Sequence, residues 1–386
     1  MQETTEQGRR RGPSAFRCPP SAFTLVELLV VIAIIGVLTA LLLPAAMNAA
    51  AAGKRNRIVA EITQFATALE DYKNNVGSYP PNAQVDGGGT TSTTPLDDSK
   101  TLSEFKRHFL KAFPQHQEPP ALIEALVGQS SNTNISNGGA TNLANGMNAA
   151  EAMVFWMSEF SDDPKYPISG SGGPSYRVQT ATPAHQQDSP ESRKWRLDIN
   201  IQQLHPRGED GFFPASYSRF VTYTDPRDGT TTRRINFWYL KASGSPAPYL
   251  YFDASRGSSV TAQNDAPAAS RPNALFQYTG PDADTLNELF FVYSIKARKS
   301  NAAANNPYRF ANDGKFQILH PGLDESWGVF PMVNPNDTTQ LINSQQYHVN
   351  TVTVELPLLS PEGPWTLELA DTLASFTNGT LESAQP

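Results

Sequence analysis

The sequence is poor in cysteine and in charge. Cys18 is the only cysteine among 386 residues, which excludes a disulfide framework and any metal site built on two or more thiolates. Charged residues make up 17% of the chain, against roughly 25% in an average globular protein. The main body has no long run of Lys and Arg, and the formal net charge is −7. A nucleic-acid-binding surface is therefore not indicated.

Motifs that carry enzyme chemistry are also missing. The six histidines show no pair with the spacing of a zinc protease motif, and the sequence has no G-x-S-x-G elbow, P-loop or dinucleotide-binding fingerprint. For His108 and His116 a packing or surface role is favoured over a metal site. The sequence predicts no catalytic residue, no required cofactor and a protein that is not an enzyme.

A long apolar run near the N-terminus is the strongest feature present. Residues Phe23 to Leu43 are almost wholly apolar, with Glu27 as the one charge. As a helix the run would extend about 30 Å, the hydrocarbon thickness of a bilayer. Arg9–Arg11 and Arg17 precede it, so that end is expected in the cytoplasm, with a single span and an extracytoplasmic remainder.

Glu27 argues against an ordinary signal anchor or secretory signal peptide. A secretory apolar region is usually about 7–15 residues long, whereas this run is longer and continues into further helix. An ionised carboxylate in lipid costs several kcal/mol unless it is paired. An acid at this position is therefore a functional candidate that needs a partner.

Residues Ser21 to Leu29 (SAFTLVELL) resemble the prepilin cleavage and methylation motif of type IV pilins and type II secretion pseudopilins. The resemblance implies that prepilin peptidase removes residues 1–22 by cutting between Ala22 and Phe23, and that the new Phe23 amine is methylated. Glu27 would pair with the Phe23 amine of a neighbouring copy during assembly. Ala22 stands where the family usually has Gly, so processing is expected to be slower at worst.

The partners implied by the resemblance are copies of the chain, other pilins, prepilin peptidase, an assembly platform protein with its ATPase, and membrane lipid. The chain would start in the cytoplasmic membrane and end in a type IV pilus or a secretion pseudopilus. The N-terminal sequence does not show which of these two filaments the chain enters, or whether it is a major or a minor subunit. The alternative is a membrane-anchored extracytoplasmic binding protein or enzyme that uses a pilin-type leader.

The helix is predicted to continue past the apolar run, to about Val76. Pro44 is expected to kink or locally melt it. Apolar residues then recur every three or four positions, as expected of one buried helix face; they are Ile58, Ile62, Phe65, Leu69, Tyr72 and Val76. Gly77 and Pro80-Pro81 are stop signals. Packing on the protein's own sheet is favoured over a coiled coil, because the stripe covers fewer than three heptads.

The predicted fold class is α+β, a pilin-like long helix packed on an antiparallel sheet with loop-rich insertions. The expected divisions are a leader (1–22), the N-terminal helix (23–77, with 23–43 transmembrane), an insertion (78–150) and a β-rich domain (151–386). Short helices are expected at 102–113, 121–127 and 149–160, and irregular segments at 86–100 and 130–148. Strands are expected at 219–224 and 233–240 around the Asp228-Gly229 hairpin signal, and at 249–253, 289–297, 316–319 and 349–356.

Residues 316–324, followed by Trp327-Gly328, resemble the late loop of major pseudopilins. In that family a glycine-aspartate turn follows a strand and in some members helps to hold calcium. The resemblance makes Asp324 a candidate calcium ligand, and Asp371 is a second candidate because its segment resembles the terminal aspartate segment of related proteins. The residues themselves favour a plain turn with solvated acids, because calcium needs six to eight oxygens.

Overall fold

A computed structural model describes residues 24–82, 99–127, 146–158, 160–177, 196, 199–206, 220–255, 275–279, 289–299, 308–328, 331–334, 337–343, 359–361, 365 and 367–384. The chain divides into two compact units, residues 1–52 and residues 53–386. The predicted leader, Phe23, most of the two irregular segments and the strand expected at 349–356 lie outside the described residues. The domain boundaries expected at 77 and 150 stay predictions.

Helix α1 runs from Leu25 to Val76, which confirms the predicted long N-terminal helix. Pro44 lies inside it without an interruption, so the expectation of local melting is wrong; a kink at Pro44 stays a prediction. The helix ends where the sequence indicated, because Gly77 takes a left-handed conformation with φ of +84° that glycine adopts without strain. The side chain of Lys111 donates to the Gly77 carbonyl oxygen over 2.8 Å.

The apolar stripe of the second half of α1 is buried in the second unit. Ile58 and Leu69 are fully buried and Val76 is partly buried; the other buried members of the stripe are Ile62, Phe65 and Tyr72. The ring of Phe65 packs edge-on against Tyr249 at 5.1 Å between centroids. The stripe therefore packs on the protein's own core, whereas the predicted packing on one sheet stays a prediction.

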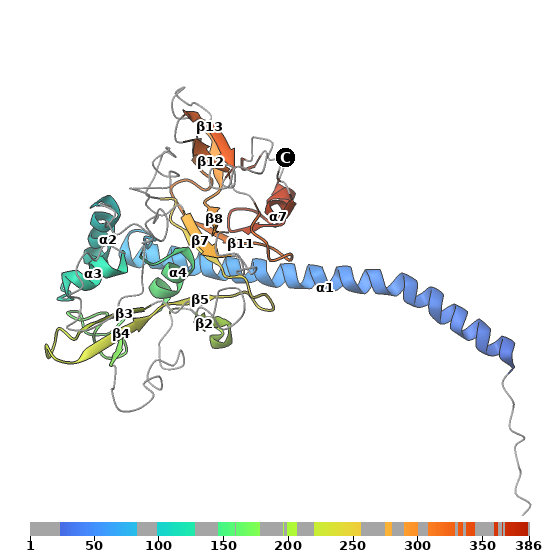
Figure 1. Ribbon diagram of the computed structural model, residues 1–386, viewed down its shortest axis with the longest axis horizontal. Coiled ribbons are helices and arrows are strands. Elements are labelled where there is room, and N and C mark those ends of the chain that lie inside the picture. The colour runs from blue at the N-terminus through green and yellow to red at the C-terminus, as the bar shows by residue number, and fades with distance from the viewer. Residues whose placement is uncertain are drawn as a thin grey trace, which may run out of the picture. The chain divides into compact units, whose positions relative to one another are not determined.

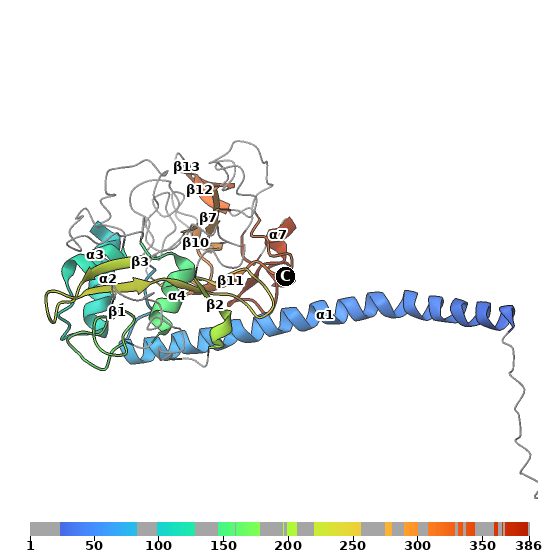
Figure 2. The ribbon, with the colours of Figure 1, turned by 60° about the horizontal axis from the view of Figure 1, so that its bottom comes forward.

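Three short helices follow: α2 (Ser99–Ala112), α3 (Pro120–Leu126) and α4 (Ala149–Met157). The first two match their predicted ranges closely and lie side by side (Figures 1 and 2). The third is shorter than expected, because Ser158 already has an extended backbone. Every residue of α4 is buried, and Asn148 and Glu151 form a capping box at its start.

All strand pairs among the described residues are antiparallel, in small sheets ordered β1-β4-β3, β14-β11-β6, β2-β5, β7-β8, β10-β9 and β12-β13. The antiparallel arrangement is as predicted, but it is distributed over several sheets. The strands are β1 (Tyr176–Arg177), β2 (Leu204–Pro206), β3 (Phe220–Thr224), β4 (Thr232–Asn236), β5 (Trp238–Leu240), β6 (Leu250–Phe252), β7 (Leu275–Thr279), β8 (Leu289–Tyr293), β9 (Lys296–Arg298), β10 (Tyr308–Phe310), β11 (Gln317–His320), β12 (Pro331–Asn334), β13 (Asp337–Asn343) and β14 (Leu373–Ala374). Single-turn helices lie at η2 (Ile201–Gln203), α7 (Leu367–Ala370) and η3 (Glu382–Ala384).

Two predicted strands are each divided in the structure. The range 233–240 forms β4 and β5, which pair with different partners: β4 lies between β1 and β3, whereas β5 pairs with β2. The buried Phe237 separates them. The range 289–297 likewise divides into β8 and β9, which belong to separate sheets. The hairpin between β3 and β4 is confirmed, with Gly229 at φ of +68°.

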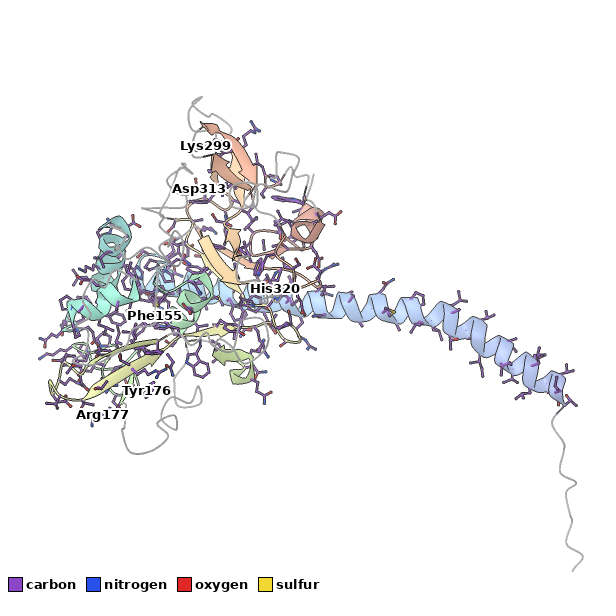
Figure 3. All side chains as sticks on the ribbon, viewed as in Figure 1. Phe155, Tyr176, Arg177, Lys299, Asp313 and His320 are labelled. Carbon is purple, nitrogen blue, oxygen red and sulfur yellow. The ribbon has the colours of Figure 1, made fainter. Side chains whose placement is uncertain are left out.

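The core of the second unit centres on α4. The indole of Trp156 is fully buried, and its Nε1 donates to the Pro81 carbonyl oxygen over 3.0 Å. The rings of Phe155 and His108 lie 5.2 and 5.0 Å from it between centroids, and Phe155 projects from α4 among the side chains that fill this part of the unit (Figure 3). This cluster therefore joins α4 to α2 and to the chain just past α1.

Candidate functional site

The first turn of α1 holds Glu27 in a capping box with Thr24. The Thr24 backbone N–H and its hydroxyl both donate to Oε2 of Glu27, over 2.9 and 2.8 Å. The Glu27 backbone N–H donates in return to the Thr24 hydroxyl oxygen over 3.2 Å. These bonds satisfy backbone donors that an α-helix otherwise leaves free at its start. Glu27 thus stabilises the beginning of the apolar helix.

Sequence reasoning singled out Glu27 but missed Thr24. The signal was present, because Thr followed three residues later by Glu before an apolar run is the sequence pattern of a capping box. Ala22 and Phe23 lie outside the described residues. The cleavage position, the methylation of Phe23 and the pairing of its amine with Glu27 therefore stay predictions.

The helix that follows Glu27 presents apolar side chains to solvent. None of the most apolar part of this helix is buried. The exposed fractions of its large apolar side chains run from 44% at Val31 to 70% at Leu41. Figure 3 shows these side chains projecting on all sides of the helix. Such a surface needs lipid or another apolar surface to cover it, and α1 is long and apolar enough to cross a membrane.

The second half of α1 is fastened to its unit by a second glutamate. Glu61 accepts hydrogen bonds at Oε2 from the Tyr249 hydroxyl over 2.6 Å, the Gln203 amide over 3.1 Å and the Ser243 backbone N–H over 3.3 Å. Burial and the neighbouring Glu61 raise the pKa of the Tyr249 hydroxyl. Glu27 is exposed and, among the described residues, bonds only to Thr24, whereas Glu61 joins the helix to segments far away in the sequence.

The N-terminal segment of the chain is similar to known sequences. The family description "Prokaryotic N-terminal methylation motif" matches residues 20–43. The chain is 37% identical over 73 residues to the type II secretion system core protein G of Pectobacterium carotovorum subsp. carotovorum. The N-terminal segment of this chain is therefore pilin-like.

The similarity of this chain to that protein is limited in extent. It covers 19% of this chain, and the chain spans 46% of the length of the secretion protein. No solved structure matches the chain. The fold described above, a long N-terminal helix followed by antiparallel sheets, is consistent with an α+β pilin-like fold.

Asp371 lies at the late loop, where it is an ion-pair partner of Arg55. Its Oδ1 accepts from the Arg55 guanidinium over 2.9 Å, and its Oδ2 accepts from the Leu323 backbone N–H over 2.7 Å. A side chain at Gly322 would collide with Asp371, so only glycine permits this approach. Lys54 forms a parallel ion pair with Glu325 over 3.1 Å. Two cations of α1 therefore tie the helix to the C-terminal loops.

The sequence made Asp324 and Asp371 candidate calcium ligands. Both oxygens of Asp371 already have partners, and Asp324 is exposed, with Oδ1 accepting from the Ser326 backbone N–H over 3.1 Å. Among the described residues, no three His, Cys, Asp or Glu side chains gather where they could share a metal ion. Calcium prefers six to eight oxygen ligands. Asp324 and Asp371 as calcium ligands stay a prediction, and Asp371 is engaged by Arg55.

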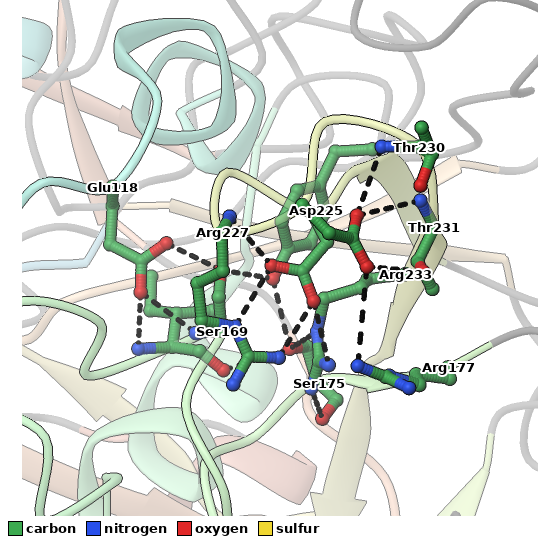
Figure 4. Close-up of polar contacts among 12 residues, drawn as sticks. Glu118, Ser169, Ser175, Arg177, Asp225, Arg227, Thr230, Thr231 and Arg233 are labelled. Atoms are coloured by element: carbon green, nitrogen blue, oxygen red, sulfur yellow. Dashed lines mark hydrogen bonds and ion pairs between the residues drawn. The ribbon is translucent and has the colours of Figure 1, made fainter.

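A buried polar network lies between the β3–β4 hairpin and the loop after α4 (Figure 4). Glu118 accepts at Oε1 from the backbone N–H groups of Ile168 and Ser169, both over 2.7 Å, and at Oε2 from the Ser169 hydroxyl over 2.6 Å. Burial raises the pKa of Glu118 in spite of these bonds. The Ser169 hydroxyl lies 2.8 Å from the Tyr223 hydroxyl, and burial raises the pKa of Tyr223 to about 12.

The same network continues to a cluster of arginines. Asp225 is fully buried, and burial alone would raise its pKa, but bonds to Arg227 and the charge of Arg233 outweigh burial and lower it. The Arg227 guanidinium lies 2.6 Å from the Asp225 carboxylate, and the Arg233 guanidinium lies 3.3 Å from the same carboxylate. Arg233 also donates to the Ser175 carbonyl oxygen over 2.6 Å. Each charge here has a partner within the unit, so the network stabilises the fold and offers no open site.

The two histidines singled out by the sequence are in the core and at its margin. His108 is buried, with Nε2 2.8 Å from the Tyr72 hydroxyl and Nδ1 3.0 Å from the Ser78 hydroxyl. His116 is half-buried against the ring of Phe109. Both have the packing role that the sequence favoured.

Proposed function

We propose that this chain is a structural subunit, a pilin or pseudopilin, that prepilin peptidase processes between Ala22 and Phe23 and that then assembles into a filament. The observation that carries the proposal is a capped helix with an exposed apolar surface beginning at a prepilin-type motif. Before assembly the subunit is held in the cytoplasmic membrane with residues 53–386 outside the cytoplasm. Its partners are other pilins, an assembly platform protein and its ATPase.

The capping box gives the assembly step a defined starting state. In the isolated subunit the Glu27 carboxylate bonds to Thr24. Cleavage before Phe23 creates a charged amine, and a buried charge is costly unless it is paired. Assembly transfers the Glu27 carboxylate from its own Thr24 to the Phe23 amine of a neighbouring copy. The pair therefore sets the register between copies, even if its net contribution to filament stability is small.

The likeness to a type II secretion protein favours the pseudopilus over the surface pilus. Deletion of the gene separates the two filaments. Loss of enzyme export with unchanged surface filaments supports the pseudopilus, whereas loss of surface filaments with normal export supports the pilus.

Mass spectrometry of the N-terminus of the mature protein tests the processing step. The expected product begins with a methylated Phe23. A mature chain that keeps residues 1–22 contradicts the proposal and leaves the membrane-anchored binding protein or enzyme as the alternative.

Substitution of Glu27 tests the assembly step. Glu27→Val is expected to be cleaved normally but not to enter filaments, because the Phe23 amine of the next copy loses its partner. Thr24→Val is the matched control, since it removes the capping hydroxyl and keeps the carboxylate. Normal filaments from Glu27→Val contradict the charge-pair mechanism without affecting the processing result.

A further inference from the structure

The outer face of α1 in the second unit carries two charges without partners. Arg57 and Asp71 are both exposed, and neither side chain has a hydrogen bond or ion pair in the part of the chain that the structure describes. The exposed Gln64 lies midway between them in the sequence. Residues seven apart fall almost above one another on a helix of 3.6 residues per turn. Arg57, Gln64 and Asp71 thus form one row along the exposed side, called here the outer row.

The other charged side chains of this half of α1 already have partners within their own unit. Their contacts are Lys54 with Glu325, Arg55 with Asp371, Glu61 with Tyr249, and Glu70 and Lys73 with Tyr79. The outer row is therefore distinct in this half of the helix, because its two charges face solvent.

Arg57 and Asp71 of the outer row cannot pair with each other within one copy. Fourteen residues of α-helix separate Arg57 from Asp71 by about 21 Å along the axis, far beyond the reach of an ion pair. A second copy whose α1 lies alongside in parallel, displaced by about 21 Å, would bring its Asp71 level with Arg57. The row carries opposite charges at its two ends, so identical copies are complementary in this arrangement.

The neighbouring surface of α1 permits such close approach. Ala60 is small, and the hydroxyls of Thr63 and Thr67 donate to the carbonyl oxygens of Val59 and Thr63 over 2.8 and 2.9 Å. These hydroxyls therefore need no new partner when another surface covers them. Little polar desolvation opposes contact with a second helix.

We propose that the outer row is a contact between copies of this chain, in which Arg57 of one copy pairs with Asp71 of the next. The proposal rests on the proposed function, because it names a second contact in the same filament. A single exposed ion pair contributes little, but every copy repeats the contact, so its effect accumulates along the assembly. Because the pair is exposed, added salt weakens it.

Charge reversal in the full-length chain, expressed in its native cells, tests the pairing. Arg57→Asp and Asp71→Arg are each expected to lower the fraction of the chain in sedimenting filaments by about fivefold or more, since like charges then meet. The double variant R57D/D71R is expected to return the fraction to within about twofold of wild type. Unchanged filaments in both single variants, or no recovery in the double variant, would overturn the proposal.

Disulfide trapping gives an independent readout with a matched control. Two tagged copies, both with Cys18→Ser, carry Arg57→Cys and Asp71→Cys respectively, and mild oxidation is expected to join them. A Gln64→Cys copy with an Asp71→Cys copy is the control, because that pair is two turns out of register. Equal trapping in both pairs, or trapping only to a different protein, would overturn the contact.

These experiments separate the two proposals. If the wild-type chain forms no filaments, the proposed function fails and this contact fails with it. If wild-type filaments form, and depend on Glu27 but not on the outer row, the function stands and only the present inference is wrong.

Discussion

The two halves of α1 differ in how far their apolar side chains are buried. In the first half Leu41 is 70% exposed, whereas in the second half Leu69 is fully buried. The first half has apolar residues all round, so no single face of it can be satisfied by one neighbouring element. The second half restricts its apolar residues to one stripe, which the second unit covers.

The glutamates of the two halves differ in a similar way, in where their hydrogen-bond partners lie. Glu61 joins the second half to Tyr249, Gln203 and Ser243 of its own chain, whereas Glu27 bonds only to Thr24 of its own first turn among the described residues. One half of the helix therefore finds its partners inside the molecule, and the other half must find them outside it. That difference is expected of the proposed filament subunit.

The largest expected difference in unfolding free energy is between truncating a leucine in the second half of α1 and truncating one in the first half. Leu69→Ala is expected to lower the unfolding free energy by about 2–5 kcal/mol, because it leaves a cavity in the core. Leu41→Ala is expected to change it by less than about 0.5 kcal/mol, because that side chain leaves no cavity. Guanidinium unfolding of the detergent-solubilised chain, followed by tryptophan fluorescence, measures both. Equal losses would contradict the division of α1.

Acid is expected to unfold the second unit while leaving the first half of α1 helical. His320 is fully buried, and burial, with a smaller effect of Lys54, lowers its pKa from 6.5 to about 3. The folded state therefore holds His320 neutral while the unfolded chain binds a proton. This stability is complete above pH 6.5 and falls by up to about 1.4 kcal/mol per pH unit as the pH drops toward 3.

Variants identify the histidine responsible. His320→Gln is expected to flatten the acid limb of a plot of unfolding free energy against pH. His116→Gln is the control, since His116 is only half-buried and should change the slope less. An acid limb that is the same in wild type and His320→Gln would assign the acid sensitivity to other groups.

Replacing Glu61 in one half of α1 and Glu27 in the other is expected to give effects of intermediate size. Glu61→Ala removes the acceptor of the Tyr249 hydroxyl, and an unsatisfied buried donor costs about 1–3 kcal/mol. Glu27→Ala is expected to leave unfolding of the second unit unchanged and to reduce filament formation. Thermal unfolding and filament sedimentation of both variants make the comparison. Loss of stability in Glu27→Ala would show that the two halves are not independent.

The features that could be predicted from the sequence are those that local pattern determines. The α1 stripe follows helical periodicity, its end follows from Gly77, and the β3–β4 hairpin follows from Asp228-Gly229 between two alternating segments. Each of these depends on residues close in the sequence, so periodicity and turn chemistry were sufficient.

The features that were missed depend on contacts distant in the sequence. The alternation across 233–240 reads as one strand, and only the separate partners of β4 and β5 divide it. The pairing of β11 with both β6 and β14, and the network around Glu118, bring together segments separated by long loops. Asp371 was singled out as an acid, but its partner Arg55 lies 316 positions away, and no local signal connects them.

The smallest expected effect concerns how the second half of α1 is held near the late loop. The Arg55–Asp371 pair is partly exposed, with 42% and 25% of the side chains accessible, so Asp371→Asn is expected to cost less than about 1 kcal/mol. The asparagine oxygen can still accept from the Leu323 N–H. Because Arg55 already supplies the cation, adding calcium or a chelator is expected to leave the melting temperature of the wild-type chain unchanged. A rise with calcium that Asp371→Asn abolishes would instead show a metal site, and the helix would then be tied to its unit by an ion from outside the chain.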